Sequence, residues 1–325
     1  NQHAPRAIGV DLYRGLASEP GHSALKEVFA TSPNVIGIER ITGVVSDVAT
    51  PPAVLPEKQV GIVDFPLDGD GFVRRAYLGT MPSVDAIDPD RFRFALALRL
   101  AEQYLASEGL TLDNGLRDPR NMRFGQTEFP RFQNADGGYV DSDAAGIQII
   151  INPRSGKTPF NIVSMADVLQ GRIDAELIRD RVVLIGVTSL SAKDLINAAA
   201  IQSENPSLVY GVEVHAHFTS QILSAVLDDR PLLNVWPDLW EYLWLVCWTF
   251  IAGFVGWYYQ STWKFSILLI LLSVALWLFC YLAISLLGLW LPFVPTMISI
   301  FATSTIVFSL PRVIRIRKTL NAYKS

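Results

Sequence analysis

Two hydrophobic patterns divide the chain near residue 238. Before this point, short apolar runs alternate with segments whose apolar residues recur every three or four positions. The short runs are typical of strands, and the recurring positions are typical of helices. After it, three long apolar stretches follow one another with almost no polar position inside them. The pattern therefore predicts an α/β domain followed by membrane-spanning helices.

The first part predicts strands and helices in alternation. The expected strands are 7–12, 35–41, 60–65, 72–79, 146–151 and 181–187, the last of them fully buried. The expected helices are 23–32, 91–106 capped by Asp90, a short one from the capping box Ser164–Asp167 to Gly171, and 211–227 with Val214, Phe218, Ile222 and Ala225 inward. A hairpin turn is signalled at Asp68-Gly69-Asp70-Gly71. Strands separated by helices, with one hairpin, predict an α/β fold with a mixed β-sheet.

The three apolar stretches cover about residues 242–259, 265–287 and 289–310. Each has about twenty residues, the length that a helix needs to cross the hydrocarbon core of a membrane. Pro292 and Pro295 fall in the first turns of the third stretch, where proline costs a helix least. Together the stretches predict an all-α three-helix transmembrane bundle. The predicted organisation is a domain at 1–230, a linker at 231–238, the three helices within 239–310, and the start of a further helical segment at 311–325.

The charges follow the same division. Of 27 Lys/Arg and 31 Asp/Glu, residues 1–238 hold 21 and 30, which gives them a net charge of −9. Residues 239–311 hold only Glu241 and Lys264. The basic tail after Leu310 and the lone Lys264 between the first two spans predict that both face the cytoplasm. Three spans then place residues 1–238 outside the cell. We expect a multi-pass protein of the inner or plasma membrane, in contact with lipids.

The ends and the special residues of the chain add further expectations. It begins Asn1-Gln2-His3, and because an exported domain needs a targeting segment, we expect an anchor helix or a cleaved signal before it. Cys247 and Cys280 both fall inside predicted spans, so no disulfide is expected. All eight tryptophans lie at or beyond Trp236. We expect Trp236, Trp240 and Trp244 at one membrane interface and Trp257 and Trp263 at the other, as in aromatic belts. The acidic first part and apolar second part exclude a nucleic-acid binder.

Acidic and basic side chains cluster around the predicted hairpin. Asp64, Asp68 and Asp70 could supply carboxylate oxygens to calcium, but their spacing does not match an EF-hand, and a hairpin turn is the better interpretation. Arg74 and Arg75 follow on the outgoing strand with side chains on opposite faces, so at most one of them faces a pocket. That arginine could bind an anion through two nitrogens, but pairing with a local aspartate is the better interpretation.

One aspartate and two histidines are further candidates. Asp194 follows the expected strand 181–187, where the loops of open sheets often bind ligands, and a loop-capping role is the alternative. His215 and His217 point about 200° apart on a helix, so they form no zinc face, but one of them could be a buried or pH-sensitive group. The sequence has no serine elbow, phosphate-binding loop or Cys/His metal spacing. We therefore expect no catalytic residue, metal or cofactor in this chain.

Several blocks of the first part resemble a known family. The blocks are Ala7-Ile8-Gly9-Val10-Asp11-Leu12-Tyr13-Arg14, Val60-Gly61-Ile62-Val63-Asp64, Asp68-x-Asp70-Gly71-x-x-Arg74-Arg75, the helix Phe94–Leu105, Val182-Val183-Leu184-Ile185-Gly186 and Gly211-Val212-Glu213-Val214-His215-Ala216. In order and spacing they resemble the type-two CHASE domain, the extracytoplasmic sensor domain of bacterial cyclases and histidine kinases. The resemblance covers about residues 6–230, and three closing spans are also typical of the family.

The resemblance implies a bacterial transmembrane receptor that controls a cytoplasmic output module. In the family this module is often a class III adenylate cyclase, and otherwise a histidine kinase, a Ser/Thr kinase or a diguanylate cyclase. Because class III cyclases and histidine kinases act as dimers, we expect a homodimer. The stimulus is expected to be an unknown extracytoplasmic ligand or protein, and Arg312, Arg315, Arg317 and Lys318 are expected to take part in signal coupling. The candidate ligand-binding residues are Asp11, Arg14, Asp64, Arg74, Arg75, Asp194 and His215.

Three other functions are alternatives to signal transduction. The outer domain could be a constitutive dimerisation or docking module that senses nothing. It could also be a hydrolase, although no catalytic motif supports this function. A channel is disfavoured because three spans with one Glu and one Lys offer no polar pathway.

Overall fold

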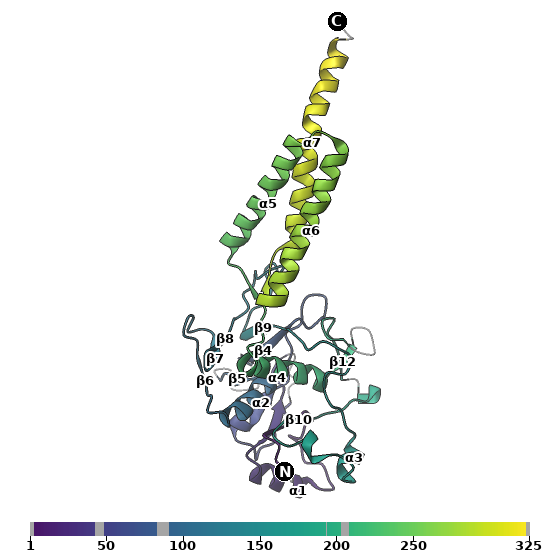
Figure 1. Ribbon diagram of the computed structural model, residues 1–325. Coiled ribbons are helices and arrows are strands. Elements are labelled where there is room, and N and C mark those ends of the chain that lie inside the picture. The colour runs from purple at the N-terminus through teal and green to yellow at the C-terminus, as the bar shows by residue number, and fades with distance from the viewer. Residues whose placement is uncertain (1–2, 43–48, 83–90, 193, 203–207, 323–325) are drawn as a thin grey trace. The chain divides into compact units, whose positions relative to one another are not determined.

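The computed structural model describes residues 3–42, 49–82, 91–192, 194–202 and 208–322. The chain forms two compact units. The first comprises residues 1–133 and 142–232, and the second comprises residues 134–141 and 233–325. Strands and helices alternate in the first unit, and three long helices dominate the second (Figure 1). Residues 134–141 thus belong to the second unit, although the sequence pattern does not set them apart from the first domain.

A mixed sheet forms the centre of the first unit. Its parallel half has the strand order β10 (Val182–Ile185), β1 (Ala7–Val10), β2 (Val35–Glu39) and β3 (Val60–Ile62). Its antiparallel half has the order β5 (Arg93–Phe94), β4 (Arg75–Thr80) and β9 (Ile147–Ile150). A bridge between Ile62 and Ala95 connects the two halves. The expected α/β class with a mixed sheet is therefore confirmed.

Helices cover both faces of the parallel half. On one face, α1 (His22–Thr31) packs Phe29 against β2 and β3. On the other face, α2 (Leu96–Ala106) packs Leu96 and Leu100 against β1 and β2. α4 (Gly211–Leu227) lies against α2, with the bounds that its apolar period predicts. The four α4 residues expected to face inward are all buried: Val214, Phe218, Ile222 and Ala225.

Smaller elements complete the first unit. One small sheet contains β6 (Leu112–Asn114), β7 (Met122–Phe124) and β8 (Thr127–Phe129), and another contains β11 (Leu195–Asn197) and β12 (Leu208–Tyr210). Short 3₁₀ helices span Glu57–Gln59, Ala175–Leu177 and Leu190–Ala192. α3 (Met165–Leu169) begins after Ser164, whose hydroxyl oxygen accepts a hydrogen bond from the Asp167 N–H at 3.1 Å. This bond and the positive φ of Gly171 confirm the expected start and end of that helix.

α2 begins later than its apolar period predicts. The sequence favours a start near residue 91, but Arg93–Phe94 forms β5 and the Ala95 N–H donates to the Leu78 carbonyl. These residues are therefore part of the sheet, and the first helical residue is Leu96. The expected cap Asp90 lies outside the described residues. The early start was wrong because an apolar strand and a buried helix end cannot be distinguished by hydrophobicity alone.

Of the expected hairpin, the turn is present but the two strands do not pair. The Gly71 N–H donates to the Asp68 carbonyl at 2.8 Å, and Leu67 bridges Val73, as in a hairpin. However, β3 and β4 do not pair with each other, because β3 joins the parallel half and β4 the antiparallel half. A second difference concerns β10, which was expected to be fully buried. It is half-buried along its whole length because it forms the edge of the sheet.

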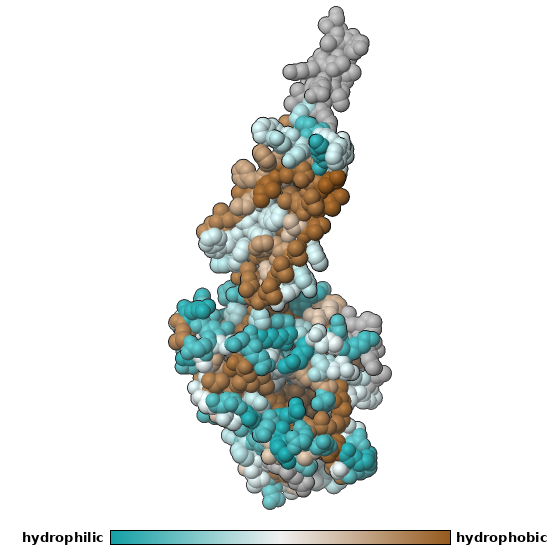
Figure 2. All heavy atoms as spheres, in the orientation of Figure 1, coloured by the Kyte–Doolittle hydropathy of each residue, from teal (hydrophilic) through white to brown (hydrophobic). Residues whose placement is uncertain are grey.

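The second unit contains three apolar helices. They are α5 (Asp238–Tyr258), α6 (Thr262–Leu287) and α7 (Phe293–Ala322), and each contains a segment long and apolar enough to cross a membrane. Figure 2 shows hydrophobic side chains along their surface. α7 begins at residue 293 instead of 289, because Gly288 ends α6 in the left-handed conformation and β14 (Leu289–Trp290) pairs with β13 (Asn234–Val235). α5 and α7 pack closely at Gly256, where a Cβ atom would lie 2.5 Å from the Ser304 carbonyl oxygen.

A glycine in β3 sets the distance between the parallel half and α2. A Cβ atom on Gly61 would lie 2.5 Å from the Leu96 Cα and 2.7 Å from its nitrogen, both backbone atoms that cannot rotate away. We expect Gly61→Ala to lower the free energy of unfolding by about 1–3 kcal/mol, as overpacked cores do. Gly69→Ala is the matched control, since nothing lies within 4 Å of its Cβ position. Urea titrations followed by circular dichroism measure both, and equal midpoints for the two variants would contradict the prediction.

Candidate functional site

The candidate site lies at the carboxyl ends of the parallel strands. β1 leads into α1 on one face of the sheet, whereas the chain after β10 leads to α4, which packs with α2 on the other face. Adjacent strands whose connections leave to opposite faces open a crevice at their carboxyl ends. Asp11 directly follows β1 and Asp194 lies in the connection after β10. This is the place where open α/β sheets bind ligands.

Asp11 is a half-buried carboxylate that no described residue neutralises. Within the described part of the chain, its side chain takes part in no hydrogen bond or ion pair, and only its backbone N–H is bonded, to the Ile185 carbonyl. Burial raises the pKa of Asp11 to about 6. The neighbouring Tyr13 phenol has its pKa raised to about 12, by burial first and then by the charges of Asp11, Asp64 and Asp194. These four side chains are therefore close enough to interact electrostatically.

Asp64 follows β3 and is firmly held. Its carboxylate accepts hydrogen bonds from the Ile41 N–H at 3.1 Å and the Thr42 N–H at 2.9 Å, and from the Thr42 hydroxyl. The Arg40 Nε lies 3.9 Å from Asp64 Oδ1. With these donors in place, Asp64 fixes the turn that follows β2 and has little capacity left for a ligand.

Asp194 lies at the N-terminus of α4. Its oxygens are so close to Gly211, the first residue of the helix, that a Cβ atom there would lie 2.6 Å from Oδ2. The positive end of the helix dipole favours an anion at this place. Burial, followed by the charge of Asp11, nevertheless raises the pKa of Asp194, while His215 and the Gly211 N–H oppose the rise. Asp194 and Asp11 thus influence each other electrostatically at the carboxyl ends of the parallel strands.

The two histidines of α4 have different surroundings. His217 is buried, and its Nδ1 accepts a hydrogen bond from the Arg154 N–H at 3.2 Å. His215 is only 4% exposed, stacks on Phe65 at 4.7 Å, and has no hydrogen bond to either ring nitrogen within the described residues. Burial lowers the pKa of each to about 4, so both are neutral at neutral pH. Asp194 and Asp64 act on His215 from the crevice and partly oppose this shift.

Four of the seven candidate residues therefore come together. Asp11, Asp64, Asp194 and His215, with Tyr13, form what we call the carboxylate site. The sequence pattern did not indicate that Phe65 stacks on His215 or that Gly211 lies against Asp194. The position of Phe65 directly after Asp64 was the only hint that it could lie near the site. Within the described residues, no group of three His, Cys, Asp or Glu side chains could hold a metal ion.

The other three candidates lie outside this cluster of contacts. Arg14 is exposed, and no hydrogen bond or ion pair involves it within the described residues. Arg74 pairs with Asp68 and Asp70, each at 2.7 Å. Arg75 is 2% exposed and donates to Asp68 Oδ1 at 2.7 Å and to Gln148 Oε1 at 2.7 Å. Both arginines are thus engaged by local carboxylates, which favours the structural alternative considered for them.

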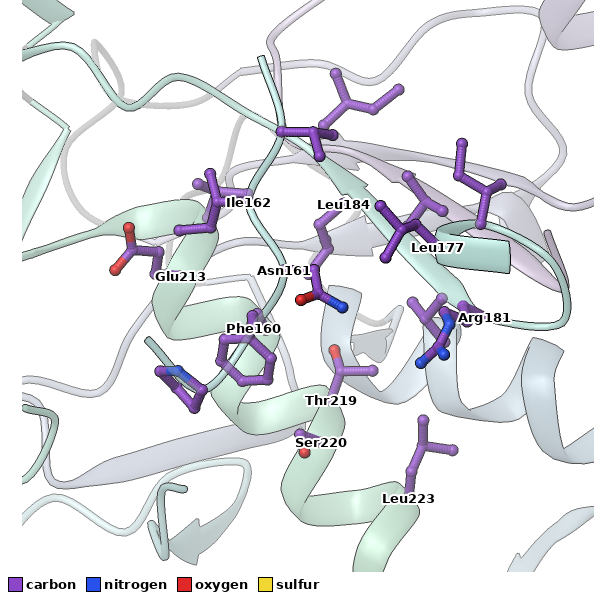
Figure 3. Close-up of a pocket in the computed structure, with 18 of the residues that line it drawn as sticks. Phe160, Asn161, Ile162, Leu177, Arg181, Leu184, Glu213, Thr219, Ser220 and Leu223 are labelled. Carbon is purple, nitrogen blue, oxygen red and sulfur yellow. The ribbon is translucent and has the colours of Figure 1, made fainter. Parts of the chain in front are cut away.

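A separate groove of about 900 Å³ lies between β10 and α4 (Figure 3). Its walls are mostly apolar and include Phe160, Ile162, Leu177, Leu184 and Leu223. In this view Asn161 lies between Leu184 of β10 and Thr219 of α4. None of the seven candidate residues lines it. Its size and lining suit an apolar molecule or side chain with a few polar groups.

The fold and the three apolar helices define the class of this protein, an α/β domain attached to membrane helices. The family model of the CHASE2 domain matches residues 1–254, which is most of the chain. The chain therefore belongs to the CHASE2 family, whose domain is an extracellular sensor. No curated protein and no solved structure matches the chain.

Proposed function

We propose that this chain is the sensing and membrane-spanning part of a bacterial receptor that controls a cytoplasmic output module. Binding in the outer domain changes the position or dynamics of α4, and the change passes through the membrane helices to the basic segment around Arg312, Arg315, Arg317 and Lys318. The output module is most consistent with a class III adenylate cyclase, with a histidine kinase, a Ser/Thr kinase or a diguanylate cyclase as the alternatives. A homodimer is the natural unit for such outputs.

One observation supports this proposal: α4 carries residues of the candidate site, and the chain continues from the end of α4 to the first membrane helix. His215 of α4 belongs to the carboxylate site and Gly211 contacts Asp194 of that site, while Ser220 and Leu223 of α4 line the groove. α4 ends at Leu227 and the first membrane helix, α5, begins at Asp238. A ligand with different affinity for two positions of α4 would shift their populations, which is what signalling requires.

A constitutive docking or dimerisation module is the second candidate. It is supported by the exposed apolar side chains near the groove, among them Ile162, Met165 and Leu169, of which Leu169 is 78% exposed. Contiguous exposed apolar surface often marks a protein interface. In this alternative the outer domain holds partners together without responding to a ligand.

Deleting residues 6–230 in front of an active output module separates the two functions. We expect the chain fused to a class III cyclase domain to change its cyclic-nucleotide production several-fold when these residues are removed and α5–α7 are kept. Unchanged production in membranes with equal amounts of both proteins would favour the docking module. A fusion to a histidine kinase domain, assayed by autophosphorylation, repeats the comparison for the second class of output.

A further inference from the structure

Residues 134–141, which we call the β8–β9 loop, belong to the second unit although the strands on either side of them belong to the first. The chain leaves the first unit after Gln133, returns at Ser142, and leaves it again after Leu232. The first unit is therefore joined to the second at two places along the chain, the β8–β9 loop and the linker that follows α4. A change in the first unit can reach the second through either connection.

The turn of the β8–β9 loop is seated on the indole ring of Trp290. The turn is closed by the Tyr139 N–H, which donates to the Asp136 carbonyl at 3.1 Å. Gly137 has a φ of +59°, and a Cβ atom on it would lie 2.8 Å from Cε3 and 2.9 Å from Cζ3 of Trp290. A Cβ atom on Gly138 would lie 3.5 Å from Cζ2, and the Tyr139 ring meets the indole edge to face with its centroid 6.3 Å away. The backbone of the two glycines thus lies against the six-membered ring, and only glycine fits at 137 without strain.

Trp290 lies where the connections of the second unit converge. It belongs to β14, between α6 and α7, and is paired with Val235 of β13. The Asn234 N–H extends this pairing by donating to the Gly288 carbonyl at 2.9 Å. β13 is part of the linker, and α5 begins three residues after it, at Asp238. The β8–β9 loop and the linker therefore both reach the small β13–β14 sheet.

Within the first unit, Arg75 of β4 holds both ends of the β8–β9 loop. Its guanidinium lies 4.6 Å from the centroid of the Phe132 ring, just before the loop. It also donates to the Asp143 carbonyl, just after the loop, and to Gln148 Oε1 at 2.7 Å. The Phe132 N–H donates to the Gln148 carbonyl at 2.8 Å. The ends of the loop are therefore fixed to the antiparallel half of the sheet and move with it.

We propose that the β8–β9 loop is a second route for the signal, from the mixed sheet through Trp290 to the connection between α6 and α7. This inference rests on the proposed function, to which it adds a route that does not pass through α4. Seated and unseated positions of the turn on Trp290 are the two states that such a device needs. The route leads directly to α7, the helix that carries the basic segment expected to couple to the output.

Hydrogen–deuterium exchange on the whole 325-residue chain in detergent micelles tests the seat itself. We expect Trp290→Ala to speed exchange in the peptide that contains Tyr139 about two- to tenfold, the effect of losing one aromatic contact. Trp277→Ala is the matched control, because Trp277 stacks on Tyr281 of its own helix at 5.4 Å and its loss removes a similar contact elsewhere. Equal exchange in the wild type and Trp290→Ala would overturn the inference.

Cyclic-nucleotide production by the chain fused to a class III cyclase domain tests the transmission. We expect Trp290→Ala and Gly137→Ala each to shift production about two- to tenfold towards the value of the chain that lacks residues 6–230. Gly156→Ala is the control for Gly137→Ala, because Gly156 also has a positive φ, +96°, and nothing lies within 4 Å of its Cβ position. Gly156→Ala and Trp277→Ala should leave production unchanged.

A reversible cross-link distinguishes transmission from a merely structural role. In a fusion with Cys247 and Cys280 replaced by alanine and a cysteine-free cyclase domain, Tyr139→Cys with Trp290→Cys removes the aromatic contact. A short bis-methanethiosulfonate then joins the two thiols. We expect the double variant to shift production as Trp290→Ala does, the cross-link to restore it, and dithiothreitol to abolish the restoration. Each single cysteine variant, treated with the same reagent, should show no restoration.

The outcomes separate this inference from the proposed function. If deletion of residues 6–230 changes production but the Trp290 and Gly137 variants do not, the inference is overturned and the proposed function stands. A cross-link that restores nothing has the same meaning. Production that the deletion leaves unchanged would overturn both. The exchange measurement involves no output module, so it tests the seat on Trp290 whatever the fusion shows.

Discussion

Replacing Arg75 by alanine is expected to lower the free energy of unfolding by about 3–5 kcal/mol, the cost of removing one member of a buried ion pair. The Arg75 guanidinium is 2% exposed and donates to Asp68 Oδ1 through Nε at 3.1 Å and Nη2 at 2.7 Å. It also donates to Gln148 Oε1 and lies over the Phe132 ring, 4.6 Å from its centroid. Its removal takes a donor from Asp68 Oδ1 and from Gln148 Oε1, although Asp68 Oδ2 keeps its bond from Arg74. Urea titrations followed by far-UV circular dichroism measure the effect.

The adjacent Arg74 is the matched control for this prediction. It pairs with the same Asp68, but its side chain is 40% exposed and its second partner, Asp70, lies at the surface. An exposed ion pair contributes about 1 kcal/mol or less. We therefore expect Arg74→Ala to have a much smaller effect than Arg75→Ala. Equal losses in the two variants would show that burial does not distinguish these arginines.

The stability of the first unit is expected to depend on pH through His215 and His217 in one direction and through Asp11 in the other. The pKa of His215 is about 4 in the folded chain and about 6.5 in the unfolded one, so only the unfolded chain takes up this proton as the pH falls from 6.5 to 4. The folded state thus loses up to about 3 kcal/mol over this range. Asp11, with its pKa raised to about 6, binds its proton earlier when folded and regains a similar amount between pH 6 and pH 4.

Two variants separate these contributions. His215→Phe keeps an aromatic ring on Phe65 and removes the titrating nitrogen, so its loss of stability from pH 6.5 to pH 4 should be about 3 kcal/mol smaller than that of the wild type. Asp11→Asn removes the opposing group, so its loss should be larger by a similar amount. Urea midpoints measured at intervals of half a pH unit show the slopes. Parallel curves for both variants and the wild type would contradict the prediction.

The local structure was readable from the sequence wherever one face of an element is buried and the other is not. α4 has the bounds that its apolar period predicts, and the capping box at Ser164 begins α3 as expected. α2 shows the limit of this reasoning: Arg93, Phe94 and Ala95 look helical by composition but pair with β4 and β3. Whether they extend a helix or a sheet depends on strands far away in the chain.

The candidate site was predictable only in part, for the same reason. Asp194 was expected in the loop after a strand, and Asp11 and Asp64 within the expected strands 7–12 and 60–65. Their convergence depends on the order β10-β1-β2-β3, which residue spacing does not specify. Successive side chains of a strand point to opposite faces, and this alternation correctly predicts that Arg74 and Arg75 differ in exposure, at 40% and 2%. It does not reveal that Asp68 reaches both of them. That no described residue forms a hydrogen bond with the His215 ring is a property of packing that no local pattern contains.

The most direct test of the central claim is the side of the membrane on which each end of the chain lies. With Cys247 and Cys280 replaced by alanine, one cysteine is introduced either at Ser18, exposed in the first unit, or at Ala322, the last residue of α7. A membrane-impermeant maleimide added to intact bacterial spheroplasts should label Ser18→Cys and spare Ala322→Cys until the cells are opened. Labelling of Ala322→Cys but not of Ser18→Cys in intact spheroplasts would contradict an extracytoplasmic sensor joined to a cytoplasmic output.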